Sequence, residues 1–515
     1  MNQLSTQAKW ILYAALNMGF CIVLVAGSSI SGGSLAELPY VALLFAICSS
    51  PIPFIDRFNG TFAMLGAAMA VYFLEFGALD AMDMLKAPTQ GLAAESMVAE
   101  GMISYTEAVL LLGALMQIIG FHAMARFTER RSSSIVVKDW PRKLLVPVGL
   151  LLWTGASCAS LYHAFVVQPE TTAIAVQAGL DKLGVWRSSG LILIELYAGP
   201  LGIMILAYWW AVWAKRAGTP LIIALILVQF IIGWLVDTKE VAFSAPAIAL
   251  LTRFIALGKV PASWLGGAVL AIALLFPLMA AKRVVMTEEL ALNRVEALPR
   301  TFAILMRTIE ESDAIRTGKY EQSSETFVQR ESVKGSVDFI IKGTAAGHPY
   351  KLGSTFEPLL YVFLPRVLWS NKPGGNSANL LNREFHISAD PDTFISPSHL
   401  GEWYWNFGLP GVVAGMALAG ALLGYVSVRF DPSQRTSVTR VLVIIVTLYL
   451  LIARSEGQIE IQYVLWARSM VLIGLLHMLF ARFAAPPKAD AAHSGRAPNS
   501  ASDGPLPLRF PNLLR

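Results

Sequence analysis

Charged residues and cysteines are both scarce in this sequence. Asp, Glu, Lys and Arg make up 15% of its 515 residues, whereas soluble domains carry about 25%. This shortage of charge excludes a soluble enzyme and a disordered protein. Three cysteines are too few for a disulfide scaffold, and each lies in an apolar run, where cysteine behaves as a small hydrophobic residue. Because 55% of the residues are hydrophobic, the remaining class is a membrane protein that crosses the bilayer many times.

Several binding motifs are missing as well. The sequence has no glycine-rich loop of the kind that cradles phosphates, no Cys/His spacing typical of zinc, and no basic cluster interleaved with aromatic residues. We therefore expect no cofactor, no metal centre and no nucleic-acid partner. Asp390 and Asp392 flank a proline, an arrangement more typical of a turn than of a divalent-metal site.

Apolar runs predict an all-α polytopic membrane protein with about twelve transmembrane helices. Residues 1–281 hold helices one to nine, and residues 403–482 hold helices ten to twelve. Residues 282–402 form a large extracytoplasmic loop domain with short helices, between helices nine and ten. Residues 483–515 form a tail rich in Ala, Pro and Ser, which we expect to be disordered and cytoplasmic. The runs lie at 10–27, 38–54, 60–79, 104–125, 144–166, 190–213, 219–236, 241–258, 262–281, 403–428, 438–454 and 463–482.

Basic residues gather in alternate short loops, at 126–143, 214–218 and 429–440. Lys and Arg in short loops mark the cytoplasmic side of a membrane protein. This distribution predicts that both termini are cytoplasmic and that the 282–402 loop lies outside. The first apolar run is long and lacks a cleavage site, so we expect a retained helix.

Ionisable residues within or beside the predicted helices concentrate near the outer side. Glu75 lies near the outer end of the third helix, and Lys239 lies in the link between the seventh and eighth. Arg454 and Glu460 lie in the link between the last two helices, and Arg468 lies one to two turns into the twelfth. Charges are costly in a membrane and usually mark function. We therefore expect these residues to line a cavity open to the outer leaflet.

The outer loop ends in a polar and aromatic motif at the mouth of the tenth helix. On a helix, His399, Glu402 and Asn406 would share one face because they are three and four residues apart. Trp403 and Tyr404 supply flat apolar surfaces, which fit either glycan contact or the aromatic belt of a membrane protein. Earlier in the loop, an apolar stretch at 356–369 predicts an interfacial helix that ends at Pro365.

These strings resemble the Wzy-type O-antigen polymerases, a family of oligosaccharide repeat-unit polymerases. The similarity covers roughly residues 328–412 and begins with an Arg-x-Ser element at Arg330 and Ser332, followed by Gly353 before an apolar stretch. Two longer strings carry most of the resemblance. Their residues are Pro365, Arg366, Trp369, Lys372 and Pro373, and then Gly401, Glu402, Asn406, Phe407 and Gly408.

The resemblance implies a GT-C-like membrane glycosyltransferase in a bacterial inner membrane, with its active site on the periplasmic side. Such an enzyme transfers a growing glycan from an undecaprenyl-diphosphate donor to a lipid-linked repeat-unit acceptor. Its partners would be these lipid-linked oligosaccharides and the membrane lipids, with a chain-length regulator as a further candidate.

This reaction makes definite demands on the side chains. A diphosphate leaving group needs positive charge in the transition state, and arginine binds phosphate bidentately. The acceptor hydroxyl needs a general base, for which Glu402 is the first candidate and His399 the second. Asn406, Trp403 and Tyr404 are the candidates for glycan binding. We expect a metal-independent, inverting displacement with a diphosphate clamp drawn from Arg330, Arg366, Lys372, Arg454, Arg468 and Lys239.

Other functions stay open at this point. An O-antigen ligase would share the fold and the clamp. A lipid-linked oligosaccharide flippase or transporter would suit twelve helices, and the loop at 56–60 is similar to the signature loop of major-facilitator transporters, although its second basic residue is missing. A transporter predicts broken helices near the midplane and an internal repeat, and no repeat is evident. A scaffold subunit would not need the arginine set.

Overall fold

The computed structural model describes most of the predicted helices. All regular elements in the described ranges are helical, which confirms the all-α prediction. The described residues are 5–31, 34–56, 60–85, 103–131, 139–162, 197–236, 239–258, 333–361, 377–387, 394–433 and 436–483, with a few single residues between them; the side chains of 235–243 lie outside this set.

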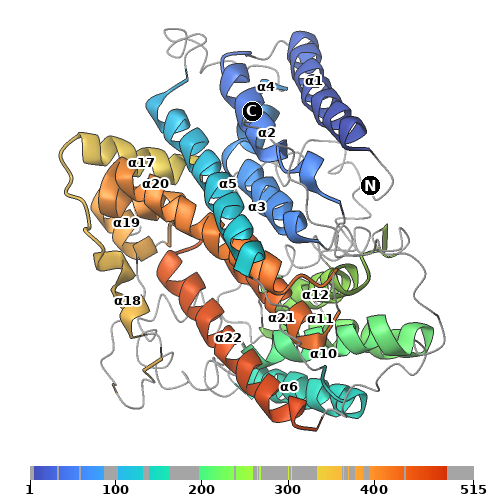
Figure 1. Cartoon of the computed structure of the whole chain (residues 1–515). Coiled ribbons are helices and arrows are strands. Elements are labelled where there is room, and N and C mark those ends of the chain that lie inside the picture. Colours follow the sequence, from blue (N-terminus) through green and yellow to red (C-terminus); the bar gives the residue numbers. More distant parts are fainter. Residues whose placement is uncertain are drawn as a thin grey trace.

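The first five helices form one group (Figure 1). They are α1 (Thr6–Ser31), α2 (Leu38–Ser49), α3 (Thr61–Phe76), α4 (Ala78–Met84) and α5 (Tyr105–Arg131). Prolines after α2 stop the helix, and a short 3₁₀ turn follows it. The axes of α3 and α4 differ by 52° because the chain bends at Gly77, where a Cβ atom would lie 2.9 Å from the Leu44 side chain. This bend directs α4 toward the start of α5.

A second group contains α6 (Arg142–Tyr162), α10 (Gly199–Trp209), α11 (Thr219–Val236) and α12 (Lys239–Leu257). Small residues let α6 and α10 approach closely, as is common in membrane helix pairs. A Cβ atom on Gly202 would lie only 2.7 Å from the Gly149 carbonyl oxygen. Between α10 and α11, a wide helical turn and a 3₁₀ turn carry the basic pair Lys215 and Arg216.

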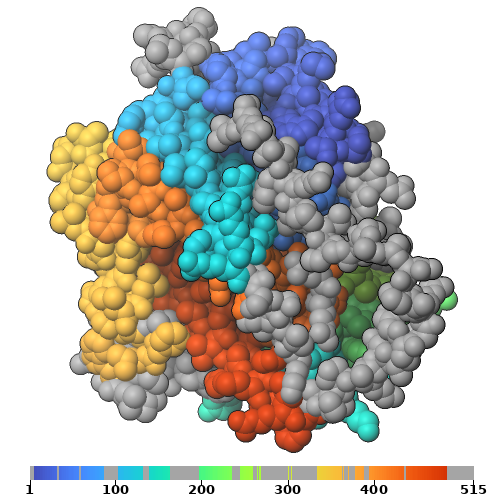
Figure 2. Space-filling view, viewed as in Figure 1, coloured from blue at the N-terminus to red at the C-terminus, as the bar shows by residue number. Residues whose placement is uncertain are grey.

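Among the residues that the structure describes, the predicted outer loop contributes three short helices, which we call the cap helices. They are α17 (Lys334–Ala345), α18 (Glu357–Leu360) and α19 (Ser377–Phe385). They line one edge of the molecule beside the start of α20 (Ser398–Arg429), and Figure 2 shows them covering that edge. The helix expected over 356–369 ends at Leu360, earlier than predicted. Leu360 and Phe363 are 80% and 62% exposed, so packing against the described residues gives little support to a longer helix.

The last three helices are α20, α21 (Val438–Thr447, continued by a wide turn to Ile452) and α22 (Ile459–Ala481). The long α20 crosses α5 through glycines, and its backbone breaks at Gly408, where φ is 63° and ψ is −150°. This region of backbone space is open essentially to glycine alone. Residues 398–407 therefore form a separate short helix, and α20 packs against the cap helix α17.

Six helices among the described residues are long and apolar enough to cross a membrane, or seven if the bent pair α3 and α4 forms one span. Three shorter apolar helices, Leu38–Phe54, Ser244–Leu257 and Val438–Ile452, occupy further predicted runs. On α1 many large apolar side chains are exposed, including Ile11 at 62% and Met18 at 66%, as a lipid-facing helix requires. These helices indicate a membrane protein. The count of twelve is not confirmed, and the run at 262–281 lies almost wholly outside the described residues.

Candidate functional site

The link between α21 and α22 collects the ends of several helices. The hydroxyl of Ser455 donates to Glu75 Oε1 of α3 at 2.5 Å, and the Ser455 carbonyl accepts from the backbone N–H of His399 at 2.9 Å. The structure thus brings Glu75, the 453–458 link and the predicted motif at 399–406 together, although they are far apart in the sequence. Of the residues that we expected to line an outer cavity, Glu75 therefore lies against the link that precedes α22.

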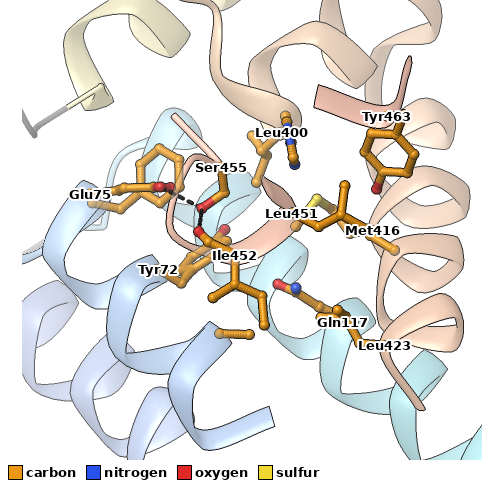
Figure 3. Close-up of a pocket in the computed structure, with 14 residues that line it drawn as sticks. Tyr72, Glu75, Gln117, Leu400, Met416, Leu423, Leu451, Ile452, Ser455 and Tyr463 are labelled. Carbon is orange, nitrogen blue, oxygen red and sulfur yellow. Dashed lines mark hydrogen bonds between the residues drawn. The ribbon is translucent and has the colours of Figure 1, made fainter. Parts of the chain in front are cut away.

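An enclosed cavity lies behind this contact (Figure 3). Its volume is about 20 Å³, and its polar lining includes Glu75, Gln117, His399 and Tyr463. That space fits about one water molecule and excludes a sugar or a diphosphate. The ring of His399 packs edge-on to Tyr463 at 5.5 Å between centroids, and the side chain is only 6% exposed. His399 therefore faces the protein interior in this conformation.

Glu402 is fully buried and caps a helix. Its Oε2 accepts from the backbone N–H of Ile459, the first residue of α22, at 2.8 Å, where a carboxylate compensates unpaired amides and the helix dipole. Its carboxyl group also interacts with that of Glu460, which accepts from the backbone N–H of Ser377 at 3.2 Å. Glu402 therefore ties α20, α22 and α19 together, and its role as a base stays a prediction.

Asn406 joins the cap to the break in α20. Because the helix breaks at Gly408, the carbonyl groups of Trp405 and Asn406 are released, and they accept from the backbone N–H groups of Lys351 at 3.0 Å and Leu352 at 3.1 Å. The Asn406 side chain accepts from the Gly353 N–H at 2.8 Å. It also donates to Thr355 Oγ1 at 2.7 Å and to the Glu402 carbonyl at 2.8 Å.

We call this arrangement of residues 351–355 on residues 402–408 the loop clasp. It explains the glycines of the family-like strings, because Gly353 has φ of 90° and Gly408 has φ of 63°. The structure thus assigns Gly353, Asn406 and Gly408 to holding the cap in place. Glycan binding by Asn406 stays a prediction, and all the hydrogen-bonding atoms of its side chain are already engaged here.

Replacing Asn406 with alanine is expected to destabilise the folded protein by roughly 2–3 kcal/mol, because buried groups lose their partners. Thr355→Val, which removes one bond at nearly constant volume, is expected to cost about 1 kcal/mol. Thermal unfolding of the purified protein in detergent measures both. Equal stability of Asn406→Ala and the wild type would contradict the loop clasp.

The two predicted aromatic contacts are also packed. Trp403 lies against Phe356 at 4.6 Å between ring centroids and covers Gly415, where a Cβ atom would meet its indole at 2.1 Å. Tyr404 is 5% exposed and faces Tyr350 at 6.4 Å between centroids. Their arrangement fits anchoring of the loop, and their glycan-binding role stays a prediction.

The candidate clamp residues divide into three sets. Arg454 lies in the link before α22 and donates to the Tyr449 hydroxyl at 3.0 Å, with its guanidinium 4.8 Å from the centre of that ring. Arg468 lies on α22 near the Tyr197 hydroxyl, so it belongs to a different place. Lys239 begins α12, but its side chain lies outside the described residues, as do Arg330, Arg366 and Lys372.

An apolar groove of about 390 Å³ reaches the residue on which Arg454 stacks. Among the residues that the structure describes, no charged side chain lines it, and the polar side chains in its lining are two serines and Tyr449. We call it the apolar groove. Its walls come from α3, α12 and α21, and they include Ala63, Met64, Val71, Ser244, Ile248, Leu251, Ile255, Ser427, Ile444, Leu448, Tyr449 and Ile452.

A half-buried ion cluster, which was not among our sequence-based predictions, holds α17 against the N-terminal helices. The Lys334 ammonium lies 2.7 Å from Asp80, 2.8 Å from Glu107 and 3.5 Å from Glu37. The three carboxylates are close enough to hold a metal ion, yet the ammonium already lies within ion-pair distance of each of them. A sequence signal was present in the short predicted outer loops at 27–37 and 80–103, which include Glu37 and Asp80 and carry almost no basic residues.

The Lys334 cluster predicts pH-dependent docking of α17. Burial raises the pKa of Glu37 to about 7, and its hydrogen bond to Glu107 adds to this, while Lys334 opposes it. Because folding raises the pKa of this carboxyl group, its protonation stabilises the docked state. The stabilisation is complete when the pH is below the ordinary pKa of 4.5, and it is lost as the pH rises through about 7. Burial lowers the pKa of Lys334, but the neighbouring carboxylates raise it by more. Lys334 therefore stays charged over the same pH range.

We therefore expect hydrogen exchange in α17, corrected for the intrinsic rate, to be faster at pH 8 than at pH 5.5. Glu37→Gln should remove most of this difference, because its amide cannot titrate. If the variant keeps the full pH dependence, Glu37 is not the titrating group.

No family model, curated protein or solved structure matches this chain. The resemblance to the O-antigen polymerases therefore stays a prediction.

Proposed function

We propose that the chain is a membrane glycosyltransferase that joins lipid-linked glycan repeat units at the outer side of a bacterial inner membrane. The observation that carries this proposal is that the apolar groove reaches Tyr449, on whose ring Arg454 stacks. A long hydrocarbon chain suits the groove, and an anionic group at the head of that chain would meet the guanidinium. This is the layout of a polyprenyl diphosphate.

The groove has the right chemistry for the lipid tail. The described part of its lining carries no charge and is mostly apolar, which suits a hydrocarbon chain better than an ion or a sugar. It extends from Gly60 and Pro432, in loops that are predicted to be cytoplasmic, to Tyr449 and Ala453 near the predicted outer side.

Arg454 has the right chemistry for the diphosphate. In the proposed reaction the acceptor hydroxyl oxygen attacks the anomeric carbon, the bond from that carbon to the diphosphate oxygen breaks, and the lipid diphosphate leaves with the electron pair. A guanidinium next to the departing oxygen lowers the barrier, since charge develops there. Burial lowers the pKa of Arg454 and Glu456 raises it, and the group stays cationic because an arginine pKa is so high.

The base for this reaction is less well placed. Glu402 and His399 are our sequence-based candidates, but both face the interior in this conformation, so acceptance of the hydroxyl proton by Glu402 would require the loop clasp to open. Inversion by a single displacement without a metal remains part of the proposal. It follows from one base acting on one side of the sugar.

The broken helix α20 separates this proposal from the transporter alternative. Transporters use the carbonyl groups at a helix break to bind ions or substrates. Here Trp405 and Asn406 give these carbonyl groups to the loop clasp, so the break serves the cap. An O-antigen ligase would use the same groove and arginine, and the geometry favours neither transferase over the other.

Deletion of the gene, with electrophoresis of the surface polysaccharide, tests the proposal. Loss of a polymerase leaves single repeat units on the surface. Loss of a ligase leaves polymer on its lipid carrier, and loss of a flippase leaves no exported repeat. Unchanged long-chain polysaccharide in the deletion strain would refute the proposed function.

A further inference from the structure

A basic hollow lies at the end of α12 that carries Arg253, and the proposed transferase makes no use of it. The volume of the hollow is about 760 Å³. Lys215 and Arg216 from the turn before α11 line it together with Arg253, and Trp210 and Trp264 complete the wall. None of the described residues that line it is acidic. Among these residues, three positive charges therefore meet in one concavity without a carboxylate.

The Arg253 side chain is held in position by the residues around it. Its guanidinium stacks 4.4 Å from the centre of the Trp210 ring, and its buried Nε has no hydrogen-bond partner among the described residues. Trp210 is itself fixed, because its Nε1 donates to Thr219 Oγ1 at 3.1 Å and its ring packs on Trp264 at 4.8 Å between centroids. The hollow is thus built from a positioned arginine on an aromatic wall.

The surroundings of the hollow are apolar. Leu257 in its lining is 38% exposed, and the neighbouring Trp213 is 43% exposed. Farther along α11, Ile223 and Leu227 are exposed as well. A ligand with hydrocarbon chains would cover these side chains while its anion entered the hollow. A free anion would leave them uncovered.

We propose that this hollow binds the phosphate headgroup of an anionic phospholipid from the leaflet that the basic loops predict to be cytoplasmic. Arginine binds phosphate oxygens bidentately, and lysine adds charge at the rim. Basic pockets between helices on this side of a membrane are suited to anionic lipid headgroups, and tryptophan favours the water–lipid boundary. The site is separate from Arg454 and does not depend on the proposed transferase activity.

Native mass spectrometry of the purified full chain tests this proposal, after reconstitution in phosphatidylcholine bilayers with or without phosphatidylglycerol. We expect the wild type to retain phosphatidylglycerol in preference to phosphatidylcholine. The triple variant Lys215→Gln, Arg216→Gln and Arg253→Gln should bind it at least roughly tenfold more weakly, because each cation near the surface strengthens binding several-fold. An unchanged melting temperature in pure phosphatidylcholine shows that the variant folds.

A matched control separates a built site from the general effect of positive charge. Arg130→Gln with Arg131→Gln removes charge at the end of α5, on the same predicted side but outside the hollow, and should leave retention unchanged. Equal loss in this control, or equal retention of both lipids by the wild type, would overturn the proposal.

A further experiment uses inorganic phosphate as the probe. The melting temperature of the wild type is measured in pure phosphatidylcholine with millimolar phosphate and, separately, with phosphatidylglycerol. If phosphate raises it as much as phosphatidylglycerol does, the hollow is a site for free phosphate and the lipid assignment fails.

Discussion

Arg454→Gln is expected to abolish long-chain glycan formation while the protein still folds. If this guanidinium stabilises the departing diphosphate, its loss should slow transfer by roughly 10²–10³-fold. Glutamine keeps a polar group near the Tyr449 hydroxyl but carries no charge. The measurement is the length distribution of the surface polysaccharide in a deletion strain that expresses the variant at the wild-type level. Transfer between lipid-linked repeats by the purified protein then gives the rate.

Two further variants sharpen this test. Arg454→Lys keeps the charge and loses the planar, bidentate fork, so we expect activity between those of the wild type and Arg454→Gln. Arg131→Gln removes a cation that stacks on Phe127 at 4.3 Å, on the side predicted to be cytoplasmic, and should leave polymer length unchanged. Full-length polymer from a normally expressed Arg454→Gln variant would remove Arg454 from the mechanism and the apolar groove from the donor site.

The sequence allowed us to predict where the helices lie. The runs at 104–125, 403–428 and 463–482 correspond to α5, α20 and α22, because hydropathy reports local burial in lipid and needs no knowledge of the partner. The same reasoning indicated that Glu75 and the link before α22 belong to one end of the molecule. Helix length was less predictable where packing decides it, as in the cap, where α18 ends at Leu360.

The contacts of the site could not be predicted in this way. Glu402 and Asn406 stood out because a motif contained them, but a motif does not say whether its residues contact a substrate or hold the structure. Lys334 pairs with Asp80, 254 positions away, and periodicity carries no information about such pairs. The loop clasp likewise depends on which carbonyl groups a broken helix releases, and this appears only once the backbone of Gly408 is known.

The largest effect on stability is expected at the crossing of α5 and α20. A Cβ atom on Gly420 would lie 1.9 Å from the Gln117 carbonyl oxygen, and one on Gly120 would lie 2.0 Å from that of Ala417. Both obstacles are backbone atoms, which no rotamer change can move. Gly420→Ala therefore has to push the helices apart along a contact that small residues keep close, and we expect a loss of roughly 3 kcal/mol or more.

Gly474→Ala provides the matched control for this prediction. Nothing lies within 4 Å of a Cβ atom at Gly474 in α22, so the same substitution should be neutral or stabilise by up to about 1 kcal/mol through helix propensity. Thermal unfolding in detergent compares the two variants, and equal melting temperatures would mean that α5 and α20 do not meet at Gly420.

Because α20 begins with the residues that hold the loop clasp and cap α22, separating it from α5 also displaces the link that carries Arg454. Gly420→Ala protein that still folds should therefore transfer glycan more slowly than Gly474→Ala protein.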